Sequence, residues 1–261
     1  ETARGGVRAV GEGLTTKINA NIGTSTDLFD VDKEIAKMKT AVSAGADAVM
    51  DLSTGGDIRK IRRTILEQCP VPLGTVPIYQ IVCDTLSAGR GIKDMDPEAM
   101  FDTVAEQAEE GVDFMTIHCG VNRQTVEVLK QYKRLAGIVS RGGAFTAQWI
   151  MRNNKENPFY EQFDRLLDIL KKYNVVLSLG DGLRPGCISD ASDTAQFSEL
   201  YVLGELTKAA LHKGVPVIVE GPGHVPLHQI KENVKLQKSV CSGAPFYVLG
   251  PLVTDVAPGY D

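Results

Sequence analysis

Short apolar runs recur along the chain and alternate with longer amphipathic stretches. Most of these runs are almost continuously apolar and rich in β-branched residues, which is typical of parallel strands buried on both faces. The pattern therefore predicts eight strands, at residues 17–22, 47–52, 73–78, 113–118, 136–140, 175–180, 216–220 and 245–249.

The stretches between the runs carry the helical spacing of apolar residues. In the first of them, Ile35, Met38 and Val42 fall on one face of a helix. Asp96 followed by Pro97 is a good helix start, because Asp caps the first turn and Pro suits the first helical position. The pattern predicts helices at residues 31–44, 97–110, 124–135, 159–172, 194–212 and 230–240.

Strand and helix alternate throughout, with no low-complexity linker and no repeated motif. Such alternation implies parallel strands joined by crossover helices, so the predicted fold class is α/β. Eight strands favour one (β/α)8 TIM-type barrel domain over residues 1–261, and an open doubly-wound sheet is the alternative. Because the sequence ends at Asp261, directly after the eighth run, we expect the last helix and a C-terminal tail to lie outside it.

The overall composition argues against several classes of protein. A formal net charge of -5 argues against a nucleic-acid or anionic-membrane partner, since both need a basic face. No apolar run reaches the ~20 residues that a membrane span requires, and no signal-peptide pattern opens the sequence. Five cysteines without a CxxC pair fit reduced thiols, so we expect a cytoplasmic protein.

Glycine and polar residues gather where the predicted strands end, whereas the strand starts are plain. In a (β/α)8 barrel the active site is built from these C-terminal ends. The clusters include residues 19–25, 50–57, 116–121, 140–143, 178–186 and 220–226. We therefore expect an enzyme whose polar site lies at one end of the barrel.

Two of these clusters contain glycine-rich turns that suit an anion. Residues 53–56 and 140–143 would let backbone N–H groups approach a phosphate, and the following helix adds a partial positive charge. Arg141 offers a forked contact to the same anion. The alternative is that glycine is needed there only for tight turns between strand and helix.

Five further side chains offer other chemistry. Asp181 and Arg184 lie on one turn and suit a ribose diol or a phosphate, or else they pair with each other and fix the loop. His118 ends an apolar run, where it is either a hydrogen-bonded structural histidine or a ligand contact. Glu220 and His224 flank a Gly-Pro-Gly turn and suit a divalent metal, although two ligands alone make a weak site.

Four motifs, in sequence order, carry a family resemblance. They are MDLSTGG at 50–56, SLGDGLRPG at 178–186, EGPGHVP at 220–226 and APFYVLGPLVTDVAPGYD at 244–261. With them the chain resembles, from about Gly13 to Asp261, the phosphomethylpyrimidine synthase family of radical S-adenosylmethionine (SAM) enzymes.

The resemblance implies a carbon–carbon lyase of thiamine biosynthesis. Its reaction would rearrange 5-aminoimidazole ribotide into 4-amino-5-hydroxymethyl-2-methylpyrimidine phosphate. The implied cofactors are SAM, a cysteine-ligated 4Fe–4S iron–sulfur cluster, and zinc or a similar divalent metal. We also expect a homodimer.

The resemblance implies site residues as well. His224 matches the first of two histidines that hold the metal. The substrate-contact positions of the family match Asn21, Met50, Tyr79, His118, Ser140, Arg141, Gly142, Asp181, Gly182, Leu183, Arg184, Glu220 and Tyr247.

Some features depart from the family pattern. The cluster-binding CxxCxxxxC motif and the second metal histidine are expected beyond Asp261, and we expect a compact form without the large N-terminal domain of many members. Cys119 and Ala144 stand where the family more often has Ala and Ser, which leaves the product open. The alternatives are a 5-hydroxybenzimidazole synthase, which uses the same substrate and cofactors in cobamide (cobalamin) biosynthesis, and a non-catalytic nucleotide-binding barrel.

Overall fold

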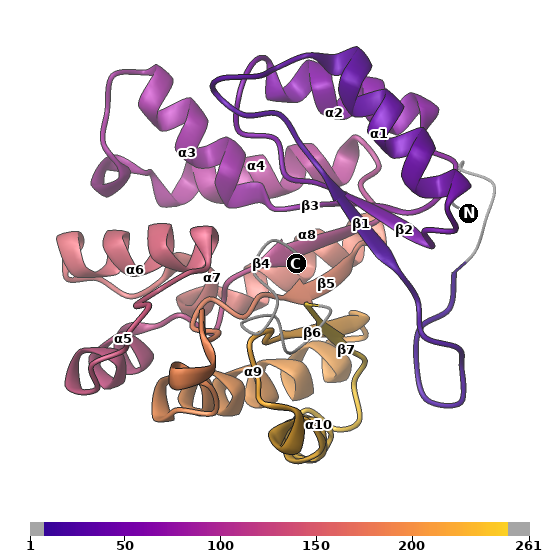
Figure 1. The fold of residues 1–261 in the computed structure, drawn as a ribbon. Coiled ribbons are helices and arrows are strands. Elements are labelled where there is room, and N and C mark those ends of the chain that lie inside the picture. The colour runs from indigo at the N-terminus through magenta and orange to yellow at the C-terminus, as the bar shows by residue number, and fades with distance from the viewer. Residues whose placement is uncertain (1–7, 250–261) are drawn as a thin grey trace. The chain divides into compact units, whose positions relative to one another are not determined.

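The chain forms two compact units in a computed structural model that describes residues 8–249. The first unit comprises the chain up to Thr116 together with residues 168–176, and the second comprises residues 117–167 and those from Leu177 onward. Figure 1 labels the helices and strands of both units. Residues 250–261, the end of the predicted C-terminal motif, lie outside the described part of the chain.

Parallel strands form the sheet of the first unit. They are β1 (Asn19–Ile22), β2 (Ala48–Asp51), β3 (Leu73–Thr75) and β4 (Phe114–Ile117), whose last residue belongs to the second unit. The register places Asn21 opposite Met50 and Gly74 opposite Phe114. The helices are α1 (Val31–Ser43), α2 (Ile58–Gln68), α3 (Pro77–Ser87), the short 3-10 helix η1 (Ile92–Asp94) and α4 (Pro97–Glu109).

The second unit continues the alternation of strand and helix. Its strands are β5 (Val176–Leu179), β6 (Val217–Gly221) and β7 (Phe246–Val248), and both neighbouring pairs are parallel. Its helices are α5 (Arg123–Gln131), α6 (Arg141–Asn153), α7 (Pro158–Glu161), α8 (Phe163–Tyr173), the 3-10 helix η2 (Ile188–Asp190), α9 (Thr194–Lys213) and α10 (Leu227–Val240). The first residue of β5 and the C-terminal part of α8 belong to the first unit.

Strand order follows chain order within each unit. The Val176 N–H donates to the Asp113 carbonyl at 3.0 Å in the first unit, and the Gly180 N–H donates to the Ile117 carbonyl at 3.0 Å in the second. An open doubly-wound sheet would instead reverse its strand order at a switch point. Sequential parallel strands joined by helices confirm the α/β class and the repeat of a TIM-type barrel. One barrel domain over residues 1–261 stays a prediction.

Capping residues set the helix boundaries. α4 begins at Pro97 as predicted, with the Asp96 carboxylate accepting a hydrogen bond from the Glu98 N–H. α1 begins after Asp30, whose carboxylate accepts from the next N–H groups of the first turn. A side-chain oxygen at this position satisfies donors that have no acceptor within the helix.

The predicted strand at residues 136–140 is wrong. Ser140 instead caps α6. Just before it, the N–H groups of Leu135 and Ala136 donate to the Asp190 carboxylate, each at 2.8 Å. A side chain rather than a strand ladder therefore satisfies this backbone, and the described part of the chain has seven strands instead of eight.

The predicted strand at 73–78 is wrong at its end. Pro77 occupies the first position of α3, so the backbone leaves the strand after Thr75. Proline suits that position because its fixed φ matches the helix and no N–H is needed. The pattern also missed α2, α3 and α6, and the predicted helix at 159–172 is divided between α7 and α8. The remaining predicted strands and helices overlap the observed ones.

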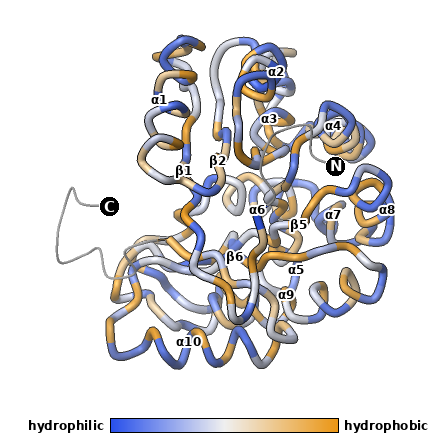
Figure 2. Tube along the Cα trace, turned by 90° about the vertical axis from the view of Figure 1, so that its right-hand side faces the viewer, coloured by the Kyte–Doolittle hydropathy of each residue, from blue (hydrophilic) through white to orange (hydrophobic). Residues whose placement is uncertain are grey.

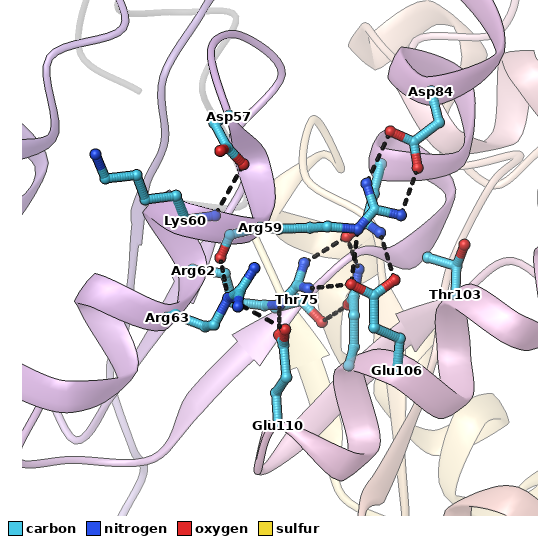
Figure 3. A network of polar contacts seen from close by, with 12 residues as sticks. Asp57, Arg59, Lys60, Arg62, Arg63, Thr75, Asp84, Thr103, Glu106 and Glu110 are labelled. Carbon is cyan, nitrogen blue, oxygen red and sulfur yellow. Dashed lines mark hydrogen bonds and ion pairs between the residues drawn. The ribbon is translucent and has the colours of Figure 1, made fainter.

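A polar network inside the first unit links α2, α3 and α4 (Figure 3). The Arg62 side chain is 1% exposed, and its Nε donates to Glu110 at 2.6 Å. Arg62 also donates to Gln80, and Arg59 donates to Glu106 at 2.7 Å. Breaking a buried ion pair of this kind costs about 3–5 kcal/mol, so the network stabilises one arrangement of the three helices.

Polar residues are also buried beneath α10 in the second unit. Hydrophilic and hydrophobic positions alternate along this helix (Figure 2). Asn233 accepts a hydrogen bond from Gln196 at 2.7 Å, and Gln237 donates to the Ala244 carbonyl at 3.1 Å.

Among residues 8–249, no helix is both long and apolar enough to cross a membrane.

Candidate active site

Three predicted contact residues lie in the first unit, two of them in strands and one in a helix. Asn21 of β1 is exposed and accepts a hydrogen bond from the Asn19 amide at 2.9 Å. Met50, opposite Asn21 in the register, is 4% exposed. Tyr79 is half-buried in the first turn of α3. The structure thus places Asn21 and Met50 next to each other on neighbouring strands.

The loops after β1 and β2 are tied to each other. The Asp51 carboxylate accepts from the N–H and the hydroxyl of Ser53, at 3.0 and 2.5 Å. The Ser53 hydroxyl oxygen accepts from the Thr24 N–H at 3.1 Å, and the Thr54 N–H donates to the Thr24 carbonyl at 2.9 Å. Burial raises the pKa of Asp51. Two N–H groups of the predicted phosphate turn at 53–56 are therefore engaged within the protein, which disfavours an anion there.

His118 follows β4 in the second unit, and its imidazole is buried and neutral. Burial, helped by the nearby Arg184 cation, lowers the pKa of His118 to about 3. Its Nε2 lies 3.2 Å from the Ser140 hydroxyl oxygen, which accepts a hydrogen bond from the Gly143 N–H at 3.1 Å. Depending on the tautomer of the neutral ring, either the Ser140 hydroxyl donates to Nε2 or Nε2–H donates to the Ser140 oxygen.

Glycines let the His118 ring lie directly against the backbone. A Cβ on Gly142 or on Gly180 would come within 3.0 Å of ring atoms, closer than real Cβ contacts allow. Because Gly142 is in the first turn of α6, the ring lies beside the N-terminus of that helix. The first N–H groups of a helix have no helical acceptor and attract anions. Arg141, exposed at the first helical position, adds a cation.

Asp181 and Arg184 form an ion pair on the turn after β5. Arg184 Nη1 lies 3.0 Å from Asp181 Oδ1, and the two side chains are 22% and 9% exposed. Burial raises the pKa of Asp181 well above its usual range, whereas Arg184 favours the ionised form and the neighbouring Glu220 opposes it. The local acid–base pair considered from the sequence is therefore present, and it uses only one oxygen of Asp181.

Two buried polar atoms of this region have no hydrogen-bond partner within residues 8–249. They are Nδ1 of His118 and Oδ2 of Asp181. A buried polar atom without a partner costs about 1–3 kcal/mol. A ligand whose polar groups hydrogen-bond with both atoms would recover this cost.

Glu220 and Tyr247 lie opposite each other in the register of β6 and β7, and both are half-buried. A pocket of about 320 Å³, including space open to solvent, lies in the second unit. Asp181, Arg184, Glu199 and Glu220 contribute to its lining. Three residues of the predicted set therefore meet at one pocket.

Two charged residues that the sequence analysis did not single out hold the turn between Asp181 and Arg184. Glu199 of α9 accepts from two consecutive N–H groups of the turn, and Arg134 donates to two of its carbonyl groups. Burial raises the pKa of Glu199 to about 8, while the two N–H donors favour the ionised carboxylate.

A model of the radical SAM ThiC family matches residues 2–261, which is almost the whole chain. The chain belongs to this family. The phosphomethylpyrimidine synthase of Desulfotalea psychrophila is 59% identical over 98% of the chain and 59% of its own length. That of Caldanaerobacter subterraneus subsp. tengcongensis is 59% identical over 97% of the chain and 59% of its own length. The chain thus spans about three fifths of these curated relatives.

The solved structures that resemble this chain are only distantly similar to it. A Yersinia pestis dihydropteroate synthase is 12% identical over 98% of this chain and 90% of its own, with a TM-score of 0.38. A likeness this low has no bearing on function.

Membership of the radical SAM ThiC family implies SAM and a 4Fe–4S cluster. No three His, Cys, Asp or Glu side chains among residues 8–249 come together as a metal site. Cys69, Cys119 and Cys241 are buried, and burial raises the pKa of the Cys119 thiol. His224 is half-buried in the loop after β6, with a left-handed φ of 53°. The described residues do not fit an iron–sulfur cluster, and they include one predicted zinc ligand.

Proposed function

We propose that this chain is the ribotide-binding core of a radical SAM carbon–carbon lyase of thiamine biosynthesis. Its reaction is the rearrangement of 5-aminoimidazole ribotide into 4-amino-5-hydroxymethyl-2-methylpyrimidine phosphate. Membership of the family and relatives named phosphomethylpyrimidine synthase support the proposal. The observation that carries it is the pair of unsatisfied buried atoms on His118 and Asp181, close to the N-terminus of a helix.

The phosphate of the ribotide is assigned to the start of α6. Ser140, Arg141 and Gly142 lie there, and the helix N-terminus supplies N–H donors with a partial positive charge. Arg141 can form a charge-assisted hydrogen bond, which suits the charged phosphate better than a neutral carbonyl or hydroxyl group of the ligand. The neutral His118 beside it suits an uncharged acceptor better than the phosphate.

The ribose is assigned to the carboxylates of the second-unit pocket. Asp181 Oδ2 and the Glu220 carboxylate accept hydrogen bonds from hydroxyl groups, and Arg184 offers donors to a nearby oxygen. Gly182 and Leu183 are proposed to shape the turn that carries Asp181 and Arg184, since their own N–H groups are bound to Glu199. Asn21, Met50, Tyr79 and Tyr247 are the remaining proposed contacts, of which the aromatic and thioether side chains suit a flat ring.

The cofactors belong to the same proposal. SAM and a 4Fe–4S cluster would supply the carbon radical, although residues 8–249 do not themselves fit the cluster. His224 is proposed as one ligand of zinc or a similar divalent metal, which the zinc content of a His224→Ala variant tests. A homodimer is proposed as the assembly, and sedimentation analysis tests it.

Calorimetric titration with the ribotide tests the binding assignment without cluster or SAM. Loss of one hydrogen bond to a charged group costs roughly 1.5–3 kcal/mol. Arg141→Ala and Arg184→Ala should therefore each weaken binding about ten- to a hundredfold. Arg152→Ala, in the last turn of the same helix α6, is the matched control and should bind like the parent. If Arg141→Ala also binds like the parent, the phosphate assignment is wrong.

The reaction itself is tested separately from binding. Anaerobic incubation of the reconstituted holoenzyme with 5-aminoimidazole ribotide and SAM should yield the pyrimidine phosphate, identified by mass spectrometry. Formation of 5-hydroxybenzimidazole instead would assign the chain to the cobamide branch. Tight ribotide binding without any turnover would identify a non-catalytic nucleotide-binding barrel.

A further inference from the structure

The turn from Asp181 to Arg184 is held by side chains rather than by regular secondary structure. Glu199, 2% exposed in α9, accepts from the Gly182 N–H at 2.9 Å and from the Leu183 N–H at 2.6 Å. Each carboxylate oxygen takes one N–H, which fixes two consecutive peptide planes. Both oxygens of Glu199 are thereby engaged with the backbone of the turn.

The carbonyl side of the same turn is bound by Arg134, whose side chain is 2% exposed. Its guanidinium donates to the Leu183 carbonyl at 2.6 Å and to the Arg184 carbonyl at 3.2 Å. It also binds both carboxylate oxygens of Asp193, at 2.6 and 2.7 Å. Because Asp193 is the N-cap of α9, Arg134 is joined to the helix that carries Glu199.

We infer that Glu199 and Arg134 are positioning residues, which hold the turn so that Asp181 and Arg184 face the ligand. The backbone N–H and carbonyl groups of a buried turn need hydrogen-bond partners. Here Glu199 accepts from the N–H groups and Arg134 donates to the carbonyl groups. The inference rests on the proposed function for the identity of the ligand, but the positioning rests on the hydrogen bonds alone.

Residue-resolved hydrogen exchange tests the positioning without any ligand. In Glu199→Gln, one acceptor oxygen becomes an amide group that faces an N–H, so the Gly182 and Leu183 amides should exchange at least about tenfold faster. The rest of the second unit should exchange as in the parent. Glu205→Gln, an acid that is 76% exposed on the same helix, is the matched control and should change nothing. Unchanged exchange at Gly182 and Leu183 would overturn the inference.

A double-mutant cycle on ribotide affinity separates positioning from general damage. Glu199→Gln should weaken binding about tenfold in the parent background. With Arg184→Ala present it should weaken binding by only about twofold, because the side chain that the turn presents is gone. An equal loss in both backgrounds would indicate a purely structural role and overturn the inference.

Arg134→Lys provides a second probe, including the case in which Glu199→Gln does not fold. Lysine keeps the charge but lacks the planar fork that reaches two carbonyl groups and Asp193 together. We expect Arg134→Lys to weaken ribotide binding about tenfold in the parent background. With Arg184→Ala present, it should weaken binding by only about twofold. If the parent protein does not bind the ribotide at all, the proposed function fails. Hydrogen exchange then still decides the positioning, since local acceleration supports it and its absence overturns it.

Discussion

Replacing Gly143 with alanine tests whether α6 and the turn after β5 depend on direct backbone contact. A Cβ on Gly143 would come within 3.0 Å of the O, Cα and C atoms of Gly182. Backbone atoms cannot rotate away as the end of a side chain can, and the Gly182 N–H is already bound to Glu199 at 2.9 Å. Either α6 or the turn must therefore move.

Two effects of opposite sign set the size of the change. Overpacking a close contact typically costs about 1–3 kcal/mol, whereas alanine is about 1 kcal/mol better than glycine within a helix. Because the Cβ would meet backbone atoms, overpacking costs about 2–3 kcal/mol, the upper half of that range. We therefore expect a net loss of about 1–2 kcal/mol, or a fall of roughly 2–8 °C in Tm. Ribotide binding should also weaken about tenfold. Arg141 lies on α6 and Arg184 on the turn after β5, so a shift of either element changes the distance between the two proposed ligand contacts.

Thermal unfolding followed by circular dichroism and calorimetric titration of the ribotide give the two quantities. Gly91→Ala is the control, because its Cβ would lie 3.6 Å from the Asp94 carboxylate, which is an ordinary contact. Its Tm and affinity should match those of the parent. A Gly143→Ala protein as stable as the parent would refute the close-contact reasoning.

Two further predictions concern histidines. The free energy of unfolding should fall by up to about 1.4 kcal/mol per pH unit as pH drops below about 6.5, because His118 gains a proton only when unfolded. Its folded pKa is about 3, so urea titrations of His118→Gln should show a flatter pH dependence, and an identical slope would contradict burial of a neutral imidazole. Protein isolated with its metal should lose zinc in His224→Ala but keep it in His212→Ala, a histidine exposed on α9, and equal zinc in both would exclude His224 as a ligand.

Most strands could be predicted from the sequence because burial on both faces requires a run of apolar residues. Leu177 and Leu179 of β5 are fully buried, as such a run indicates. The run at 136–140 has a similar composition, yet Val139 is 42% exposed and the neighbouring backbone is bound by Asp190. A local pattern cannot reveal an acceptor about fifty residues away, so the sequence predicts a strand at a segment that is irregular in the structure.

The candidate site was predictable only in its glycines and in the polar residues at strand ends. Glu199 left a weaker signal, since Ala195 and Leu203 lie four residues to either side and are buried, which places an acid on the apolar face of α9. An acidic residue on the apolar face of a helix is expected to have a buried hydrogen-bond partner, but the sequence does not indicate which residue that is. Arg134 lies after α5 in an irregular segment, and its partners Leu183, Arg184 and Asp193 are 49 to 59 residues away. No periodicity or motif predicts such contacts.

Buried carboxylates on helices hold glycine-containing strand ends in both units. In the first unit, Glu34 of α1 is 2% exposed and accepts from the Gly23 N–H at 2.7 Å. In the second, Glu199 binds the Gly182 N–H in the same manner. Glycine costs roughly 0.5–1 kcal/mol in lost conformational freedom and has no side chain to fix the turn. A buried carboxylate offsets that cost, while the missing Cβ lets Leu52 pack against Gly23 and Val121 pack against Gly182. In both units, helix carboxylates that bind the turn itself therefore help to fix its geometry.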